Sequence, residues 1–403
     1  MSYYPMINFG DIYEEPVRNG LTRPTTVRGN GYCMVNMGEL FAYDRLNGQK
    51  MERVPLNDRE LKVATLRIGD LLFARSSLKI EGTGKCSIVV GLPEITTFES
   101  HLIRVRLNQK MAVPVFYYYF FQSFMGRATV LSIAKQVGAA GLPGSKLASL
   151  KVPYPNIKEQ VTIASILSSY DDLIENNRRR IQLLEQSARL LYKEWFISLR
   201  FPGHEHVKIN NGVPEGWERT TLGGLCEEIR ESVSPDSVEP DTPYIGLEHI
   251  PRRSIALNEW STADQVTSSK HRFREGEILF GKIRPYFHKV GIAFVDGVAS
   301  SDAIVIRPFR DELRAFVSMT VSSDGFVAVT AQTMKEGSKM PRADWKQMQQ
   351  YFVPLPPEGL LVMFNSIIDP ILQQLKTLSF ENRNLSKARD ILLPRLMSGE
   401  VVV

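Results

Sequence analysis

The 403-residue chain is long enough for two or three domains, and its content of 43% hydrophobic and 23% charged residues is ordinary for a soluble globular protein. No run approaches the roughly 18 apolar residues of a membrane span, and Met1–Pro5 does not begin a secretory signal, so we expect a cytoplasmic protein without membrane contact. Three widely separated cysteines argue against a disulfide framework or a zinc ribbon, and the net charge of +5 permits a polyanionic partner without requiring one.

The chain repeats itself with a period near 200 residues. Four segments of the first half recur in the same order in the second: Phe9–Glu15 as Leu222–Glu228, Leu66–Arg75 as Phe273–Lys282, Gly144–Leu147 as Gly337–Met340, and Val152–Pro155 as Val353–Pro356. The spacing varies between the matches, as insertions and deletions in surface loops would produce. The sequence therefore predicts two similar domains in tandem.

Each repeat begins with a stretch that reads as mostly β, in which short apolar runs such as Cys86–Val90 and Ala303–Ile306 are separated by Gly, Pro, Asn and Asp. A proline-bounded exit then leads into a long helix. We predict an α+β fold with four segments: a first domain at 1–155, a first long helix at 156–200, a second domain at 201–356, and a second long helix with a C-terminal tail at 357–403.

The two long helices carry heptad seams, in which apolar residues recur in steps of four and three. The first seam is Ile163, Leu167, Tyr170, Ile174, Asn177, Ile181, Leu184, Ala188, Leu191 and Trp195. The second is Phe364, Ile368, Ile371, Leu375, Leu378, Asn382, Leu385, Arg389, Leu392 and Leu396. These seams predict an antiparallel coiled coil; the alternative is two independent amphipathic helices, each packed on its own domain.

In a flush antiparallel pair, the first position of one seam meets the tenth of the other, and Asn177 opposes Asn382. A buried pair of asparagines lowers stability but fixes register and orientation. Such a spacer would be on the order of 50 Å long, more than the roughly 34 Å of one turn of B-DNA. Two similar heads on a rigid spacer would suit a gapped, asymmetric DNA site, although the same shape would suit a scaffold for two proteins.

Basic and hydroxyl residues recur at equivalent places in the two domains. Because base readout needs long donors and phosphate contact needs Lys, Arg or hydroxyl groups, they are candidates for DNA binding. The candidates are Arg75, Lys79, Lys85, Lys135, Ser145 and Lys146 in the first domain, and Lys282, Arg284, Tyr286, Lys289, Lys335, Ser338, Lys339 and Arg342 in the second. The alternative is that exposed Lys and Arg only solvate the surface. We interpret Arg178–Arg180 as a solvated helix face, and we expect no metal at His204 and His206.

No catalytic site can be assembled from the motifs present. The Asn/Asp-Pro-Pro-Tyr loop of an adenine methyltransferase is absent, and neither Glu60–Lys62 nor Asp344–Lys346 follows the Pro-Asp strand of a nuclease. The segment Gly82–Cys86 departs from a P-loop, because Lys79 replaces its first glycine and Cys86 its Mg²⁺-binding hydroxyl. We therefore expect catalysis to reside in partner subunits.

Four further motifs suggest a family: Gly69–Arg75, Gly144–Pro155, Glu159–Gln160 at the start of the first long helix, and Pro214–Trp217 before the second domain. Over essentially its whole length the chain resembles the specificity subunits of type I restriction–modification systems. Two features depart from the family's pattern, since the first domain lacks the Pro-x-Gly-Trp opening and the second helix begins at 357–360 without a Glu-Gln pair.

The resemblance implies two target-recognition domains that each read one half of a bipartite site in double-stranded DNA. It implies that the helices set the spacing and dock two methylation subunits, and that restriction subunits join the complex. It also implies that this chain binds no cofactor, while S-adenosylmethionine, ATP and Mg²⁺ belong to the partners. The alternatives are a coiled-coil adaptor that binds two proteins without DNA, and a self-contained DNA-modifying enzyme.

Overall fold

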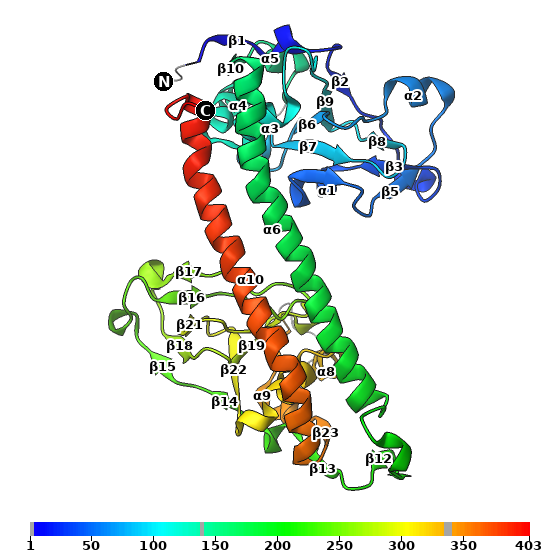
Figure 1. The fold of residues 1–403 in the computed structure, drawn as a ribbon, viewed down its shortest axis with the longest axis vertical. Helices are drawn as coiled ribbons and strands as arrows, with labels where there is room; N and C mark the ends of the chain where they lie inside the picture. The colour runs from blue at the N-terminus through cyan, green and yellow to red at the C-terminus, as the bar shows by residue number, and fades with distance from the viewer. Residues whose placement is uncertain (1–3, 138–140, 334–340) are drawn as a thin grey trace. The chain divides into compact units, whose positions relative to one another are not determined.

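The structure is a computed structural model that describes residues 4–137, 141–333 and 341–403. It divides into two compact units: unit 1 comprises Met1–Asp172 and Leu385–Val403, and unit 2 comprises Leu173–Asn384. Two long helices, α6 (Ile157–Tyr192) and α10 (Glu358–Ser398), contribute residues to both units (Figure 1). None of the helices in the described ranges is long and apolar enough to cross a membrane.

Unit 1 contains a five-stranded sheet of order β2-β9-β6-β7-β4, a three-stranded sheet β5-β3-β8 and the pair β1-β10. The strands are β1 (Met6–Asn8), β2 (Arg18–Asn19), β3 (Tyr32–Val35), β4 (Arg45–Asn47), β5 (Glu52–Val54), β6 (Leu71–Ala74), β7 (Cys86–Gly91), β8 (Thr96–Phe98), β9 (Leu102–Val105) and β10 (Lys151–Pro153). The shorter helices are α1 (Met37–Ala42), α2 (Asp58–Val63), α3 (Pro114–Gln122), α4 (Phe124–Val137) and α5 (Gly144–Ala148).

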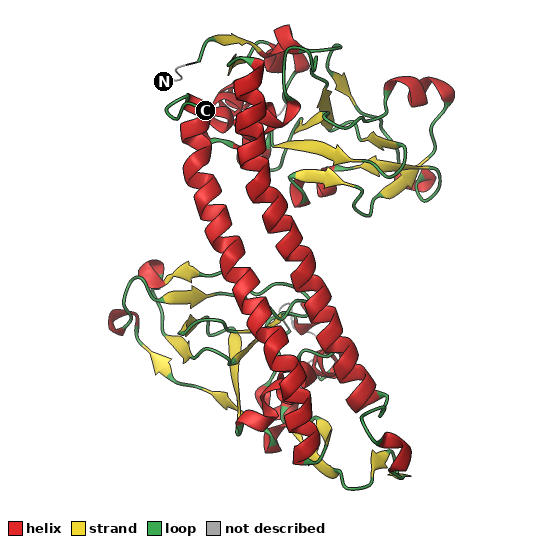
Figure 2. Ribbon diagram, in the orientation of Figure 1, coloured by secondary structure: helices red, strands yellow, loops and turns green. Residues whose placement is uncertain are grey.

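Unit 2 contains a four-stranded sheet β14-β22-β19-β20, a five-stranded sheet β15-β18-β21-β16-β17 and the pairs β13-β23 and β11-β12. Both units combine strands with helices (Figure 2). The strands are β11 (Ile209–Asn210), β12 (Val213–Pro214), β13 (Glu218–Thr221), β14 (Cys226–Ile229), β15 (Ser232–Val233), β16 (Pro243–Ile245), β17 (Ser261–Thr262), β18 (Lys270–Phe273), β19 (Ile278–Gly281), β20 (Val290–Ile292), β21 (Gly297–Ala299), β22 (Ala303–Pro308) and β23 (Phe352–Leu355), and the shorter helices are α7 (Arg314–Val321), α8 (Asp324–Gln332) and α9 (Trp345–Met348).

The two units share one internal plan. In unit 1, β6 lies antiparallel between β7 and β9, and in unit 2, β19 lies antiparallel between β20 and β22. All four residues of β6 and of β19 are buried, which explains why both segments are uninterrupted apolar runs. Each strand follows a glycine with positive φ, Gly69 at +92° and Gly276 at +85°, which permits the turn that precedes it. The repeat in the sequence therefore corresponds to a repeat of tertiary structure.

In unit 1 the two long helices pack on each other and on the core. Ile163 and Leu167 of α6 belong to the same buried cluster as Leu396 of α10, together with residues of β6 and α3. Nearby, Asp171 accepts hydrogen bonds from Arg389 at 2.6 Å and from the Tyr119 hydroxyl at 2.6 Å. Arg389 occupies a seam position, and its charge is paired there instead of facing an apolar neighbour.

In unit 2 the helices are likewise joined to each other and to the core. The rings of Trp195 and Phe364 lie 5.7 Å apart, which is the contact that the flush register predicts between the tenth and first seam positions. Ala188 and Leu375 lie in the same buried cluster, which also includes Phe280 of β19. The two alternatives for the helices are therefore compatible, because each helix packs on its partner and on its unit's domain.

The polar pair in the seam differs from the one expected. The Asn177 amide donates to Glu381 Oε2 at 3.2 Å, and no hydrogen bond joins Asn177 to Asn382 among the contacts of the described residues. Oδ1 of Asn382 is buried without a hydrogen-bond partner. The longer side chain of Glu381, which directly precedes Asn382 on α10, reaches Asn177. That the two asparagines oppose each other across the helix pair stays a prediction.

Candidate nucleic-acid interface

Four of the candidate residues of unit 2 lie in the connection between β19 and β20: Lys282, Arg284, Tyr286 and Lys289. This connection contains a single 3₁₀ turn, Pro285–Phe287. The residues on either side, Arg284 at φ +50° and His288 at φ +54°, adopt the left-handed conformation although neither is glycine. Such backbone is costly for residues with a side chain and persists only where the surroundings hold it in place.

The turn is held by a buried histidine. His288 is 3% exposed, and its Nε2 lies 2.9 Å from the carbonyl oxygen of Ser322, to which it donates. Its other ring nitrogen is 3.4 Å from Asp324. Burial lowers the pKa of His288, although Ser322 and Asp324 act in the opposite direction. The backbone of Arg253 also donates to the His288 carbonyl, at 2.9 Å, so a second segment is tied to the turn.

The turn displays an aromatic ring and two cations. The Tyr286 side chain is 51% exposed, and its ring lies edge-on to that of Phe287 with centroids 5.0 Å apart. The guanidinium of Arg252 stacks over the Phe287 ring at 4.1 Å, and that of Arg284 lies 5.9 Å from it. Arginine fixed on an aromatic face is preorganised to contact phosphates or base edges, because less side-chain freedom is lost on binding. Arg252 was missed by sequence reasoning; its only signal was the Arg252–Arg253 pair after Pro251.

Two predicted lysines of unit 2 are less available. Lys282 donates to the Ser301 carbonyl at 3.0 Å and is half-buried, which lowers its pKa. Lys289 donates to the Leu247 carbonyl, and burial lowers its pKa also. Both amines are therefore partly satisfied within the unit.

Arg342 lies beside the turn, since its backbone bridges to Ile283, and its side chain is 60% exposed although it pairs with Asp302 at 3.3 Å. Three other candidates, Lys335, Ser338 and Lys339, lie outside the described residues.

The segment that follows β6 in unit 1 makes the same two backbone hydrogen bonds as the segment that follows β19 in unit 2. We call this shared pattern the backbone frame. Arg75 donates from its N–H to His101 at 2.8 Å and accepts from Leu142 at 2.7 Å. Lys282 does the same in unit 2, with partners Asp302 at 2.7 Å and Ala343 at 2.8 Å. The equivalence of Arg75 and Lys282 that the sequence repeat suggested is thus reproduced in the hydrogen bonds of both units.

The side chains of the unit 1 connection differ in availability. Lys85 donates to the Phe41 carbonyl at 2.9 Å and lies 3.1 Å from Asp44, so its charge is used within the unit. Lys79 is exposed, and its neighbour Leu78 is fully exposed at the tip of the loop. Arg127 of α4 holds this loop by donating to the Glu81 carbonyl at 2.6 Å.

Three candidates of unit 1 come from helices. Ser145 and Lys146 are exposed on α5. Lys135 lies on α4, but its side chain lies outside the described part of the structure.

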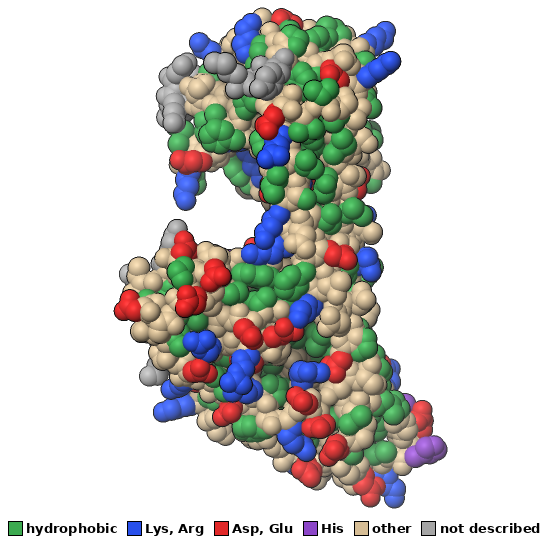
Figure 3. All heavy atoms as spheres, turned by 60° about the vertical axis from the view of Figure 1, so that its left-hand side comes forward, with side chains coloured by type: hydrophobic (Ala, Val, Ile, Leu, Met, Phe, Trp, Pro, Cys, Tyr) green, Lys and Arg blue, Asp and Glu red, His purple; other side chains and the backbone are tan. Residues whose placement is uncertain are grey.

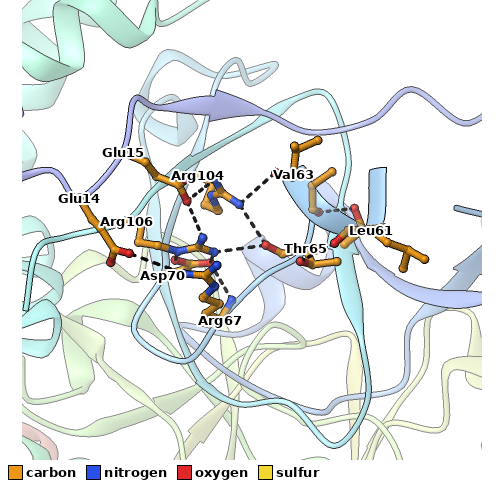
Figure 4. Close-up of polar contacts among 11 residues, drawn as sticks. Glu14, Glu15, Leu61, Val63, Thr65, Arg67, Asp70, Arg104 and Arg106 are labelled. Carbon is orange, nitrogen blue, oxygen red and sulfur yellow. Dashed lines mark hydrogen bonds and ion pairs between the residues drawn. The ribbon is translucent and has the colours of Figure 1, made fainter. Parts of the chain in front are cut away.

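Two further arginines of unit 1 are buried and structural. Arg106 forms a two-pronged contact with Asp70, with both N–O distances 2.7 Å (Figure 4). Arg104 donates to Glu15 at 2.8 Å and to the Thr65 carbonyl at 3.0 Å. Burial lowers the pKa of Arg104, and the neighbouring charge of Arg106 adds to this effect. The cluster fastens the N-terminal segment to β9 and leaves no free cation for DNA.

Charges of both signs are interspersed on the surface. On the face drawn in Figure 3, Lys and Arg side chains alternate with Asp and Glu, and no continuous basic field covers it. The candidate interface is therefore a set of local clusters on two equivalent connections.

Several known proteins are similar to this chain. Residues 45–186 match the family described as type I restriction modification DNA specificity domain. The type I restriction enzyme MjaIX specificity subunit of Methanocaldococcus jannaschii is 25% identical, over 96% of this chain and 91% of that one. The EcoKI specificity subunit of Escherichia coli K12 is 30% identical, over 46% of this chain and 41% of its own.

Over nearly its whole length the chain is therefore similar to type I restriction–modification specificity subunits. A solved structure has a similar fold: the crystal structure of the type I restriction-modification system S subunit from M. genitalium aligns with a TM-score of 0.59 and 16% identity, over 98% of this chain and 96% of that one.

The motifs that suggested the family stabilise the fold of this chain. Gln160 is fully buried, accepts from the Val113 N–H at 2.8 Å and donates to the Pro155 carbonyl at 2.9 Å. At the equivalent point of the second helix, Leu361 is 1% exposed within the apolar core. In the second helix, apolar packing of Leu361 therefore takes the place of the hydrogen bonds that Gln160 makes in the first. Trp217 of the Pro-Glu-Gly-Trp motif packs on Phe201 with ring centroids 5.1 Å apart.

Proposed function

We propose that the two domains, 1–155 and 201–356, each read one half of a bipartite, gapped site in double-stranded DNA. The observation that supports this proposal is the repeated connection after β6 and β19, which has one backbone frame and two different sets of exposed side chains. In unit 1 the tip presents Leu78 and Lys79, whereas in unit 2 it presents Arg284 and Tyr286. A shared frame with unlike side chains is what recognition of two unlike half-sites requires.

The long helices, 156–200 and 357–403, would set the distance between the half-sites and dock two methylation subunits, which restriction subunits then join. Exposed apolar side chains on α6 support a docking role, since Leu173, Leu183 and Leu190 are each more than half exposed. The specificity subunit would contribute no catalysis. S-adenosylmethionine, ATP and Mg²⁺ would be bound by the partners, and the complex would work in the cytoplasm.

The test is to co-express the chain with the methylation subunit encoded beside it and to map methylated adenines across the genome. We expect a motif of two specific parts separated by a fixed gap. Replacing residues 1–150 by those of a relative should change one part and leave the other intact. Methylation without such a motif, or none from a well-formed complex, would instead support an adaptor that joins two proteins.

A further inference from the structure

A buried carboxylate on α6 binds a loop of unit 2. Glu185 is 5% exposed, and its Oε1 accepts three hydrogen bonds from one short segment: from the Ser254 hydroxyl at 2.6 Å, the Ile255 N–H at 2.8 Å and the Ala256 N–H at 3.0 Å. A carboxylate that accepts several backbone N–H groups binds them strongly, because each bond is charge-assisted. The segment is therefore fixed to the helix at a single point.

This segment continues directly into the candidate interface. Arg189, one turn further along α6, donates to the Arg253 carbonyl at 2.7 Å. Arg253 in turn donates to the carbonyl of His288, and Arg252 forms an antiparallel bridge with Lys289. An unbroken series of contacts thus leads from α6 through 252–256 to the turn that displays Tyr286.

The contact cannot be removed without cost to the loop. Ile255 and Ala256 are 1% and 0% exposed, so their N–H groups have no access to water if the carboxylate is lost. If the 252–256 segment moves so that these two N–H groups find other partners, Arg252 moves away from its place over Phe287. The geometry of the basic turn therefore depends on the helix.

Among the described residues of unit 1 we find no equivalent of this contact. The position of α10 that corresponds to Glu185 in the sequence repeat is Ser386, whose side chain makes no hydrogen bond among the described residues. In unit 1, β4 is joined to α6 by the ion pair of Arg45 with Asp172, and the Asp172 side chain is 64% exposed. Unit 1 therefore has an exposed ion pair where unit 2 has a buried carboxylate.

We propose that Glu185 is a positioning residue for DNA recognition by unit 2: it fixes the 252–256 segment, and through it the placement of Arg252, Arg284 and Tyr286. Arg189 assists by holding the Arg253 carbonyl. This inference rests on the proposed function, because it assumes that the turn reads one half-site.

The experiment compares Glu185→Leu with Glu185→Gln and with Glu175→Leu in the co-expressed methylation complex. Glu175 is a matched control, since it lies on the same helix, is half exposed and, among the described residues, forms an ion pair with Arg179 on the surface. For Glu185→Leu we expect discrimination in the half-site of unit 2 to fall about tenfold, with the other half-site unchanged, as the loss of one well-placed base contact would give. Glu185→Gln should be intermediate, because its amide oxygen still accepts, and Glu175→Leu should match the wild type.

Arg189→Met provides a second variant in case Glu185→Leu does not assemble, since it removes only the bond to Arg253. Relaxation confined to the unit 2 half-site supports the proposal. A motif unchanged in both variants, or relaxed equally in both halves, overturns it. A wild-type complex that yields no two-part motif overturns the proposed function instead, so the two failures are distinguishable.

Discussion

Asn177 of α6 donates its side-chain hydrogen bond to Glu381 of α10, 3.2 Å away, whereas Oδ1 of Asn382 is buried without a hydrogen-bond partner. The two seam asparagines are therefore unequal. The first gains an ionised acceptor, whereas the second has a buried carbonyl oxygen that no donor reaches.

Replacing Asn382 by Leu should stabilise unit 2. The change removes an unsatisfied buried acceptor and completes the apolar seam, which we expect to add about 1–2 kcal/mol to the free energy of unfolding. Asn177→Leu should stabilise less, because it also removes the bond to Glu381. Thermal melting of the two variants checks this; if Asn382→Leu melts no higher than Asn177→Leu, the inequality is refuted.

Neutralising Asp70 should destabilise the protein more than neutralising its counterpart Glu277. Asp70 and Arg106 are 1% and 7% exposed, whereas the side chain of Arg307, the partner of Glu277, is 33% exposed. Asp70→Asn removes the buried carboxylate partner of Arg106, which keeps an ion pair with the partly exposed Glu15, and should cost about 2–3 kcal/mol. Glu277→Gln should cost less, because water reaches Arg307. Hydrogen exchange of β6 and β19 would resolve the two units, and equal losses would argue against this account.

Lys79 and Lys85 should differ in their effect on DNA binding. Lys79 is free at the surface, whereas Lys85 is engaged by Phe41 and Asp44. Lys79→Ala should make the slope of log affinity against log salt shallower by about one, and Lys85→Ala should leave the slope unchanged while lowering stability. Binding titrations of the assembled complex at several salt concentrations provide the measurement, and the reverse pattern would contradict the assignment.

Acid should weaken unit 2 through His288. Burial holds the folded pKa of this imidazole below its usual 6.5, so the unfolded chain takes up the proton first. The contribution of His288 to stability is complete above pH 6.5 and is lost as the pH falls below it. His288→Asn, which tolerates the left-handed backbone and does not titrate, should reduce the fall in melting temperature between about pH 7 and pH 5.5. Part of the fall in melting temperature should remain in the variant, because burial also lowers the pKa of His271. If the fall is as large in the variant as in the wild type, His288 is not its cause.

Two of the three cysteines, Cys86 and Cys226, should be unreactive in the native protein. Cys86 and Cys226 are each 1% exposed, and burial raises the pKa of the Cys226 thiol to about 12 and that of Cys86 further still. The reactive thiolate is therefore scarce at neutral pH. A colorimetric thiol reagent should label both only after denaturant is added. Cys33 is 9% exposed and should react first; prompt native labelling of Cys86 would contradict the prediction.

The helices were the most predictable part of the fold. Heptad spacing encodes which residues face a partner, and every seam position, from Ile163 to Leu396, is buried or half-buried in the structure. The repeat likewise predicted the matching frames around Arg75 and Lys282. Both signals can be read from the order of residues along the chain, without knowing which distant side chains meet in the fold.

The site was less predictable because availability is set by distant residues. Lys85 is a residue of the type that contacts DNA, but the fold places Asp44 beside it and their ion pair uses its charge. Arg252 is far in sequence from Phe287, on which it stacks. Glu185 resembles a solvent-facing residue of an amphipathic helix, and only the tertiary structure places Ser254 and its neighbours against it.

Unit 1 is built from two separate stretches of the chain, and this determines when it can fold during synthesis. Its core includes Leu393, Leu396 and Met397, which the ribosome adds only after all of unit 2. Unit 2, drawn from the single stretch Leu173–Asn384, can complete its own core as soon as that stretch has emerged. The domain that is translated first is thus the last to be finished, and until then it exposes the apolar surface that α10 will cover.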